Sequence, residues 1–143
     1  MAEMSKRRLL PVGLQSFEGI RKEGYLYVDK TDLVWQLVNN GSKYDYLSRP
    51  RRFGKSLLVD TLACYLSGKK ELFEGLKIMD LEQDWVKRPV IRLDMSRGGA
   101  NATTLRSYLN KVFQTYERKY DVEVLPGDSL ANRFDGIVRT ACE

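Results

Sequence analysis

The stretch YLSRPRRFGKSLL, residues 46–58, constrains the fold more than any other part of this 143-residue chain. It overlaps a strand-like pattern, KYDYLS, in which apolar and polar residues alternate. After Ser56, apolar residues recur at the spacing of an amphipathic helix: Leu58, Leu62, Tyr65 and Leu66. A strand that leads through a glycine-containing turn into a helix is the arrangement of a phosphate-binding loop, or P-loop. The stretch therefore predicts a strand–loop–helix unit with a phosphate site at its turn.

The residues of the turn supply each part of that chemistry. Gly54 lets the backbone approach a phosphate closely, Lys55 supplies a positive charge, and Ser56 supplies a hydroxyl that can bind Mg2+. The N–H groups and the dipole at the start of the helix add attraction for an anion. We therefore predict ATP and Mg2+ as ligands, with nucleotide contacts from consecutive residues: Pro50, Arg51, Arg52, Phe53, Gly54, Lys55, Ser56 and Leu57.

One position departs from the usual motif. The usual loop begins with a glycine five residues before Gly54, where this chain has Arg49, although Pro50 can shape the turn by fixing its own φ angle. Three interpretations stay open: a nucleotide site with an unusual entrance, a structural turn without a ligand, or a nucleic-acid-binding module that uses Arg49, Arg51, Arg52 and Lys55. The strand-like and helical patterns on either side favour the nucleotide site.

Patterns elsewhere in the chain predict an α/β fold, a P-loop-type parallel sheet flanked by helices. Further strand-like runs are YLYV at 25–28 and PVIRLD at 89–94, and residues 69–85 predict short helical turns. Helical periodicity, capping serines and stop signals predict a short helix at 16–24 and further helices at 31–40, 103–120 and 129–141. The chain ends on a helix where another strand is expected, so we predict that the sheet is truncated.

Composition excludes several classes of site. The chain has no histidine, which removes histidine-based zinc sites and Ser–His or Cys–His catalytic pairs. Cys64 falls on the apolar side of a predicted helix, as a buried thiol does, and Cys142 is far from it.

No apolar run approaches the roughly 18 residues of a membrane span, and we expect a cytoplasmic protein. The net charge of +5 favours a phosphate-bearing ligand without choosing between nucleotide and nucleic acid.

Four segments resemble the bacterial AAA-ATPase-like domain family: LPVGLQSFEGIRKEGYLYVDKTDLVWQLV, YLSRPRRFGKSLLVDTL, GKKELFEGL and RPVIRLDMS. The resemblance runs from about Leu10 to the end and implies one P-loop domain over 1–143, with 1–9 flexible. In that family the loop entrance without glycine is the usual form. Members often carry a C-terminal PD-(D/E)XK nuclease-like domain, which implies a nucleic-acid partner through a domain that this chain lacks.

The resemblance also implies a role for YVDKT, residues 27–31. Related ATPases have an element in the corresponding place near the adenine, so Tyr27 is expected close to the base of the nucleotide. On the residues alone, the same segment is explained by a strand followed by a helix cap.

Asp94 ends the VIRLD run in the manner of the acid of a Walker B strand, so Asp94 and Ser56 are the candidate Mg2+ ligands. Met95 and Ser96 follow it instead of a second acid, and no general base is provided for water. The resemblance places the true Walker B strand beyond the helix at 129–141. We therefore expect no appreciable ATP hydrolysis by this chain. An incomplete sheet would expose an edge and apolar helix faces, which favours self-association.

Overall fold

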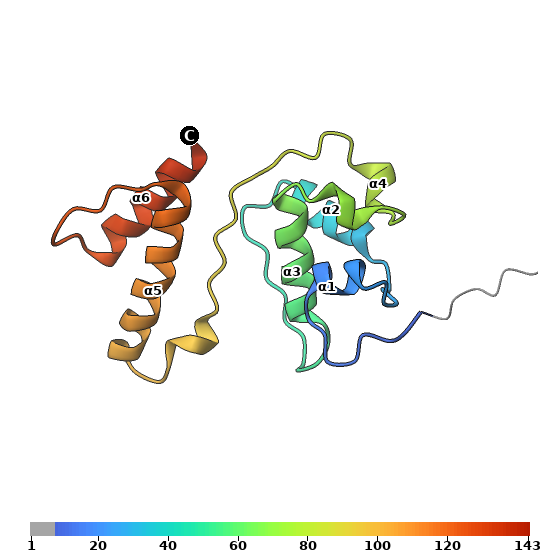
Figure 1. Cartoon of the computed structure of the whole chain (residues 1–143), viewed down its shortest axis with the longest axis horizontal. Helices are drawn as coiled ribbons and strands as arrows, with labels where there is room; N and C mark the ends of the chain where they lie inside the picture. Colours follow the sequence, from blue (N-terminus) through green and yellow to red (C-terminus); the bar gives the residue numbers. More distant parts are fainter. Residues whose placement is uncertain (1–7) are drawn as a thin grey trace, which may run out of the picture. The chain divides into compact units, whose positions relative to one another are not determined.

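The computed structural model describes residues 8–143, and helices are the only regular secondary structure within them (Figure 1). These residues divide into two compact units, one ending at Arg88 and one running from Pro89 to Glu143. Most of the segment 1–9 that we predict to be flexible lies outside the described residues. The single domain over 1–143 stays a prediction. No helix in the described part is long and apolar enough to cross a membrane.

The first unit is built from helices that the sequence patterns predict. Ser16 caps the first of them, where its hydroxyl accepts the N–H of Gly19 at 3.2 Å, as expected from the sequence. The short helical turns predicted at 69–85 are also present. In chain order the elements are α1 (Phe17–Lys22), α2 (Thr31–Asn39), α3 (Lys55–Leu66), the 3-10 helix η1 (Lys70–Phe73) and α4 (Ile78–Leu81).

An aromatic cluster forms the core of this unit. The rings of Phe17 on α1 and Phe73 on η1 are fully buried with centroids 4.8 Å apart, and Tyr65 on α3 packs edge-on against Phe73 at 6.2 Å. Cys64 is buried beside them, as predicted. Burial of these side chains holds α1, α3 and η1 together, because apolar area removed from water is the main stabilising contribution in a unit of this size.

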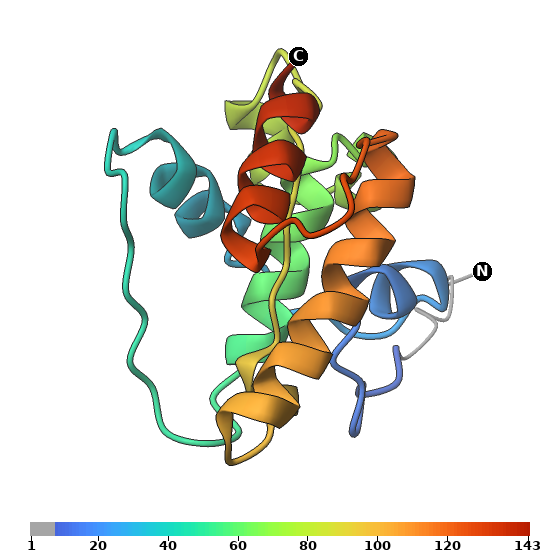
Figure 2. The same cartoon turned by 90° about the vertical axis from the view of Figure 1, so that its left-hand side faces the viewer.

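The predicted α/β fold with a parallel sheet is wrong for residues 8–143, because no strand occurs there. The three strand-like runs are extended but lack a partner strand. Figure 2 shows the long irregular segment that leads from α2 to α3, in which the side chains of Tyr44 and Tyr46 are 90% and 92% exposed. Two backbone bonds within the described residues start from the run 25–28: the N–H of Tyr25 donates to the carbonyl of Ile20 at 3.0 Å, and the N–H of Leu26 donates to the carbonyl of Leu9 at 2.8 Å. Residues with strand propensity fit a pleated surface, but a strand forms only where a neighbouring backbone pairs with it.

The second unit is a pair of packed helices preceded by a 3-10 turn: η2 (Met95–Gly98), α5 (Ala102–Tyr120) and α6 (Leu130–Cys142). The rings of Phe113 and Phe134 stack between the helices with centroids 5.6 Å apart. The segment 89–94, predicted as a strand, instead lies along α5. There the N–H groups of Arg92 and Asp94 donate to the hydroxyls of Tyr116 and Tyr108, each at 2.8 Å. Tyrosine hydroxyls thus take the place that a neighbouring strand would have.

Asp29 links two helices of the first unit. One oxygen of its carboxylate accepts the N–H and the hydroxyl of Thr31 at 2.9 and 2.7 Å, and the other accepts the N–H of Lys77 at 2.8 Å. The hydroxyl of Thr31, fully buried, accepts the N–H of Ile78 at 3.1 Å. The start of α2 and the start of α4 are therefore held by one pair of side chains. Asp29 thus bonds the first N–H of α2, although Lys30, the residue at the cap position, makes no side-chain bond to the helix, and the strand predicted before the cap is absent.

We expect Asp29→Ala to lower the free energy of unfolding by about 2 kcal/mol, since it leaves the N–H of Lys77 and the start of α2 without their acceptor. Asp32→Ala is the matched control, because Asp32 makes only a partly exposed ion pair with Lys77 at 3.3 Å, and we expect it to cost about 0.5 kcal/mol. Urea unfolding followed by circular dichroism measures both. Equal losses in the two variants would contradict the linking role of Asp29.

The hydrogen bonds of Asp29 also predict how the stability of the fold changes at low pH. Partial burial alone would raise the pKa of Asp29, but the hydrogen bonds from Thr31 and Lys77 outweigh it and lower that pKa below its ordinary value of 3.8. A carboxyl with a lowered pKa stabilises the fold above its ordinary pKa, and the stabilisation is lost as the pH falls through the lowered value. We therefore expect the difference in stability between wild type and Asp29→Ala to shrink below about pH 4.

Candidate functional site

The loop that ends at Gly54 enters α3 through two left-handed backbone positions. Gly54 precedes the first residue of the helix with φ 77°, and Arg52 has φ 68°. Glycine adopts this conformation at no steric cost, whereas for arginine it is a strained state that costs roughly 1 kcal/mol or more. The carbonyl of Gly54 accepts the first helical bond, from Leu58 at 2.9 Å. The N–H groups of the first turn of α3 have no helical carbonyl to bond, so they are available to an anion.

A hollow of about 640 Å³ opens at this helix start. One wall is the segment before α1, residues 12–15, and the other is the loop and the first turn of α3. Its volume lies in the range of sites that take small organic ligands. The lining residues are Val12, Gly13, Leu14 and Gln15 from the first wall and Arg52, Gly54, Lys55, Ser56 and Leu57 from the second. The structure therefore gathers five of the nucleotide-contact residues predicted from sequence around one cavity.

A partly buried contact between α1 and α3 holds the two walls in place. The N–H of Phe17, the first residue of α1, donates to the Asp60 carboxylate on α3 at 2.7 Å. A carboxylate at the start of a helix is favoured by the free N–H groups and the dipole there. Because residues 12–15 lead directly into α1, this contact fixes them next to the first turn of α3.

Lys55 folds back over its own loop. Its ammonium group donates to the carbonyl of Arg49 and approaches the carbonyl of Pro50 at 3.4 Å. These bonds close the turn that a glycine usually makes in a loop of this kind. Arg52, by contrast, makes no hydrogen bond or ion pair with other residues in the described part of the chain.

Four predicted contact residues do not line the hollow. Pro50, Arg51 and Phe53 are exposed on the loop outside it, with the Phe53 side chain 66% exposed. Tyr27 packs in the aromatic core, its ring centroid 5.1 Å from that of Phe17, and burial raises the pKa of its hydroxyl. Their roles in binding stay predictions.

Residues 12–15 are the part of the cavity that sequence reasoning missed. They lie within the segment that carries the family resemblance, but no chemical motif marks them. A local signal was present: Gly13, at φ 76°, makes a turn just before the capping serine, and it stands between two apolar residues. Val12 is 87% exposed and Leu14 is 38% exposed, so both offer apolar surface to the hollow that they line.

The two predicted Mg2+ ligands lie in different units, Ser56 in the first and Asp94 in the second. One carboxylate oxygen of Asp94 accepts the N–H of Ser96 at 3.2 Å and its hydroxyl at 2.5 Å, and the other pairs with Arg97 at 3.1 Å. The hydrogen bond from Ser96 and, to a lesser extent, Arg97 lower the pKa of Asp94. Across residues 8–143 no group of three or more acidic, cysteine or histidine side chains could hold a metal ion. The metal roles of Ser56 and Asp94 stay predictions.

A loop that enters a helix through Gly-Lys-Ser beside a cavity with a cationic wall is typical of proteins that bind phosphorylated ligands. The chain belongs to the AAA-ATPase-like family, since the family model described as predicted AAA-ATPase matches residues 11–143. It is 39% identical over 138 residues to the "Uncharacterized protein in vnfD 5'region" of Azotobacter chroococcum mcd 1, a match that covers 94% of this chain and 26% of the relative. The chain thus spans about a quarter of the length of that relative. No solved structure matches this chain. Membership of this family supports nucleotide binding as the general class of function.

Proposed function

We propose that the first unit binds ATP with Mg2+ in the hollow between residues 12–15 and the start of α3. The observation that carries this proposal is the composition of the cavity wall, in which Gly54, Lys55 and Ser56 face the apolar segment before α1. A nucleotide has the matching polarity, with a charged chain at one end and a flat, largely apolar base at the other.

The polyphosphate lies at the loop. The first-turn N–H groups of α3 and the ammonium of Lys55 are the donors, and the hydroxyl of Ser56 is placed to bind the Mg2+ that accompanies the phosphates. Binding requires Lys55 to exchange its bonds with the carbonyls of Arg49 and Pro50 for bonds with phosphate oxygens. That exchange is favourable because phosphate oxygens carry a negative charge that the carbonyls lack, which adds Coulomb attraction to the hydrogen bond.

The base lies against residues 12–15. Val12 and Leu14, with Leu57 from α3, give this end of the hollow apolar surface, and Gln15 adds an amide that both donates and accepts hydrogen bonds. Apolar contacts with a few polar groups are the usual composition of sites for small organic ligands.

The proposed function is nucleotide binding. Among the described residues that line the hollow, none carries a carboxylate.

An equilibrium titration of the chain with Mg-ATP by calorimetry tests the proposal. We expect one saturable site with a dissociation constant in the micromolar to submillimolar range, about −5 to −8 kcal/mol, that changes little between 50 and 200 mM salt. A single-stranded oligonucleotide at the same two salt concentrations is the comparison. The exposed loop carries Arg49, Arg51 and Arg52 near Tyr44 and Tyr46, and a nucleic-acid site there would lose affinity steeply with salt. Steeply salt-dependent oligonucleotide binding without ATP binding would favour the nucleic-acid module instead.

A further inference from the structure

We propose that Arg52 is the second cation of this nucleotide site, and that it makes the site select a polyphosphate chain over a monophosphate. This inference rests on the proposed function and assigns different roles to arginines that are adjacent in the sequence. Arg51 and Arg52 are equivalent by residue type, and sequence alone gives no reason to separate them.

Arg51 and Arg52 differ in their position relative to the cavity. All three loop arginines are exposed, but of the three Arg52 alone lines the hollow, together with Lys55, and Arg49 and Arg51 do not line it. Arg49 contributes its backbone carbonyl to the loop through the bond from Lys55.

Arg52 is also the cation without a partner at the site. The ammonium of Lys55 already bonds to carbonyls of the loop, while no contact with another described residue engages the Arg52 side chain. An approaching phosphate chain therefore meets one committed cation and one that is free to bind it.

The backbone at Arg52 gives an independent reason to assign it a role. Its φ of 68° belongs to the left-handed region, where glycine and asparagine are favoured and arginine is not. Strained backbone positions are frequent at ligand sites, so this one supports a role for Arg52 there.

The chemistry follows from having two cations. A guanidinium can bond two phosphate oxygens at once, and Lys55 acts as a compact charge beside it. A chain of two or three phosphates can contact both groups simultaneously, whereas a single phosphate satisfies one. We therefore expect the wild-type chain to bind ATP and ADP well and AMP weakly.

Asparagine substitution provides a matched test, because asparagine tolerates the left-handed backbone and removes the charge. We expect Arg52→Asn to weaken Mg-ATP binding by about tenfold to thirtyfold and AMP binding by less than about threefold. Arg51→Asn, the control one residue away, changes either affinity by less than about twofold. Arg52→Lys keeps only part of the ATP affinity, because it returns the charge but not the contact of one guanidinium with two phosphate oxygens.

Titrations of ATP, ADP and AMP against the three variants at one salt concentration separate the outcomes, with circular dichroism as the check that each is folded. If wild type binds ATP but Arg51→Asn and Arg52→Asn lose equal affinity, or if Arg52→Asn loses as much for AMP as for ATP, this inference is overturned and the proposed function stands. A wild-type chain that binds none of the three nucleotides overturns both.

Discussion

Lys55→Ala lowers the affinity of the chain for Mg-ATP by about 100-fold, the largest effect that we expect from any single substitution in the hollow. The substitution removes the one ammonium at the start of α3, and a lost charge-assisted hydrogen bond to a phosphate costs about 2–3 kcal/mol. It also removes the bonds from Lys55 to the carbonyls of Arg49 and Pro50, which close the loop. Calorimetric titration of both proteins measures the change.

A second variant separates the two contributions of Lys55. In Lys55→Gln the amide can still donate to the loop carbonyls but carries no charge, so we expect nearly the same loss of affinity as in Lys55→Ala. Lys43→Ala, an exposed lysine of the same segment that does not line the hollow, is the control and leaves the affinity within about twofold. Equal affinity of wild type and Lys55→Gln for Mg-ATP would show that the phosphates do not lie at the loop.

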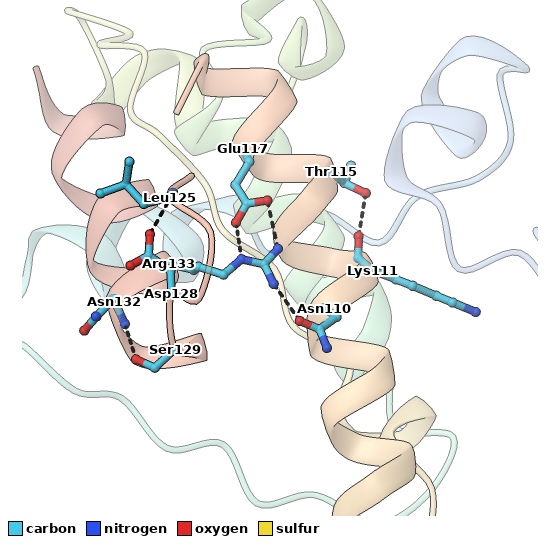
Figure 3. A network of polar contacts seen from close by, with 9 residues as sticks. All are labelled: Asn110, Lys111, Thr115, Glu117, Leu125, Asp128, Ser129, Asn132 and Arg133. Atoms are coloured by element: carbon cyan, nitrogen blue, oxygen red, sulfur yellow. Dashed lines mark hydrogen bonds and ion pairs between the residues drawn. The ribbon is translucent and has the colours of Figure 1, made fainter. Parts of the chain in front are cut away.

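Arg133→Ala is expected to destabilise the second unit by about 3–5 kcal/mol, because it leaves a buried carboxylate without its partner. Figure 3 shows the contact: the guanidinium of Arg133 on α6 bonds both oxygens of Glu117 on α5, at 2.7 and 2.8 Å, and the amide oxygen of Asn110 at 2.6 Å. The two charged side chains are only 11% and 9% exposed. The bond with Glu117 raises the pKa of Arg133, so the guanidinium stays charged.

The same helix offers the control. Arg139 also pairs with an acid, Asp135 at 2.8 Å, but these side chains are 74% and 68% exposed, and Arg139→Ala is expected to cost less than about 0.5 kcal/mol. Hydrogen exchange of the α5 and α6 amides reports on this unit alone. Loss of protection there in Arg133→Ala but not in Arg139→Ala is the expected result. Equal protection in the two variants would mean that the buried pair does not hold the helices together.

The helices of this chain could be predicted from the sequence because their signals are local. Ser16 and Ser129 each accept an N–H three residues ahead, at 3.2 Å, and both were recognised as caps from the sequence. The apolar spacing after each serine defines one face of a helix within a few turns. Such signals do not depend on distant parts of the chain.

The strands were predicted wrongly because pairing is not local. PVIRLD has the composition of a strand, yet its N–H groups at Arg92 and Asp94 find acceptors in Tyr116 and Tyr108, on a helix that begins eight residues after Asp94. Nothing in the run itself distinguishes a tyrosine hydroxyl from a neighbouring strand as the acceptor.

The candidate site also has a part that a local motif predicts and a part that depends on contacts between distant residues. The loop residues Gly54, Lys55 and Ser56 form a short motif and were found from sequence. The opposite wall was missed, because residues 12–15 reach the hollow through a hydrogen bond between Phe17 and Asp60, which are 43 positions apart. The difference between Arg51 and Arg52 could not be predicted either, since it depends on which of two adjacent residues lines a cavity.

The most direct test of the proposed site is a nuclear magnetic resonance titration of the chain with Mg-ATP, in which backbone amide shifts are followed residue by residue. We expect the amides of Gly13, Leu14, Gly54, Lys55 and Ser56 to shift together and to saturate with one common dissociation constant, because both walls contact one ligand. Shifts confined to the exposed segment 43–53, with residues 12–15 and 54–56 unchanged at saturation, would contradict the account.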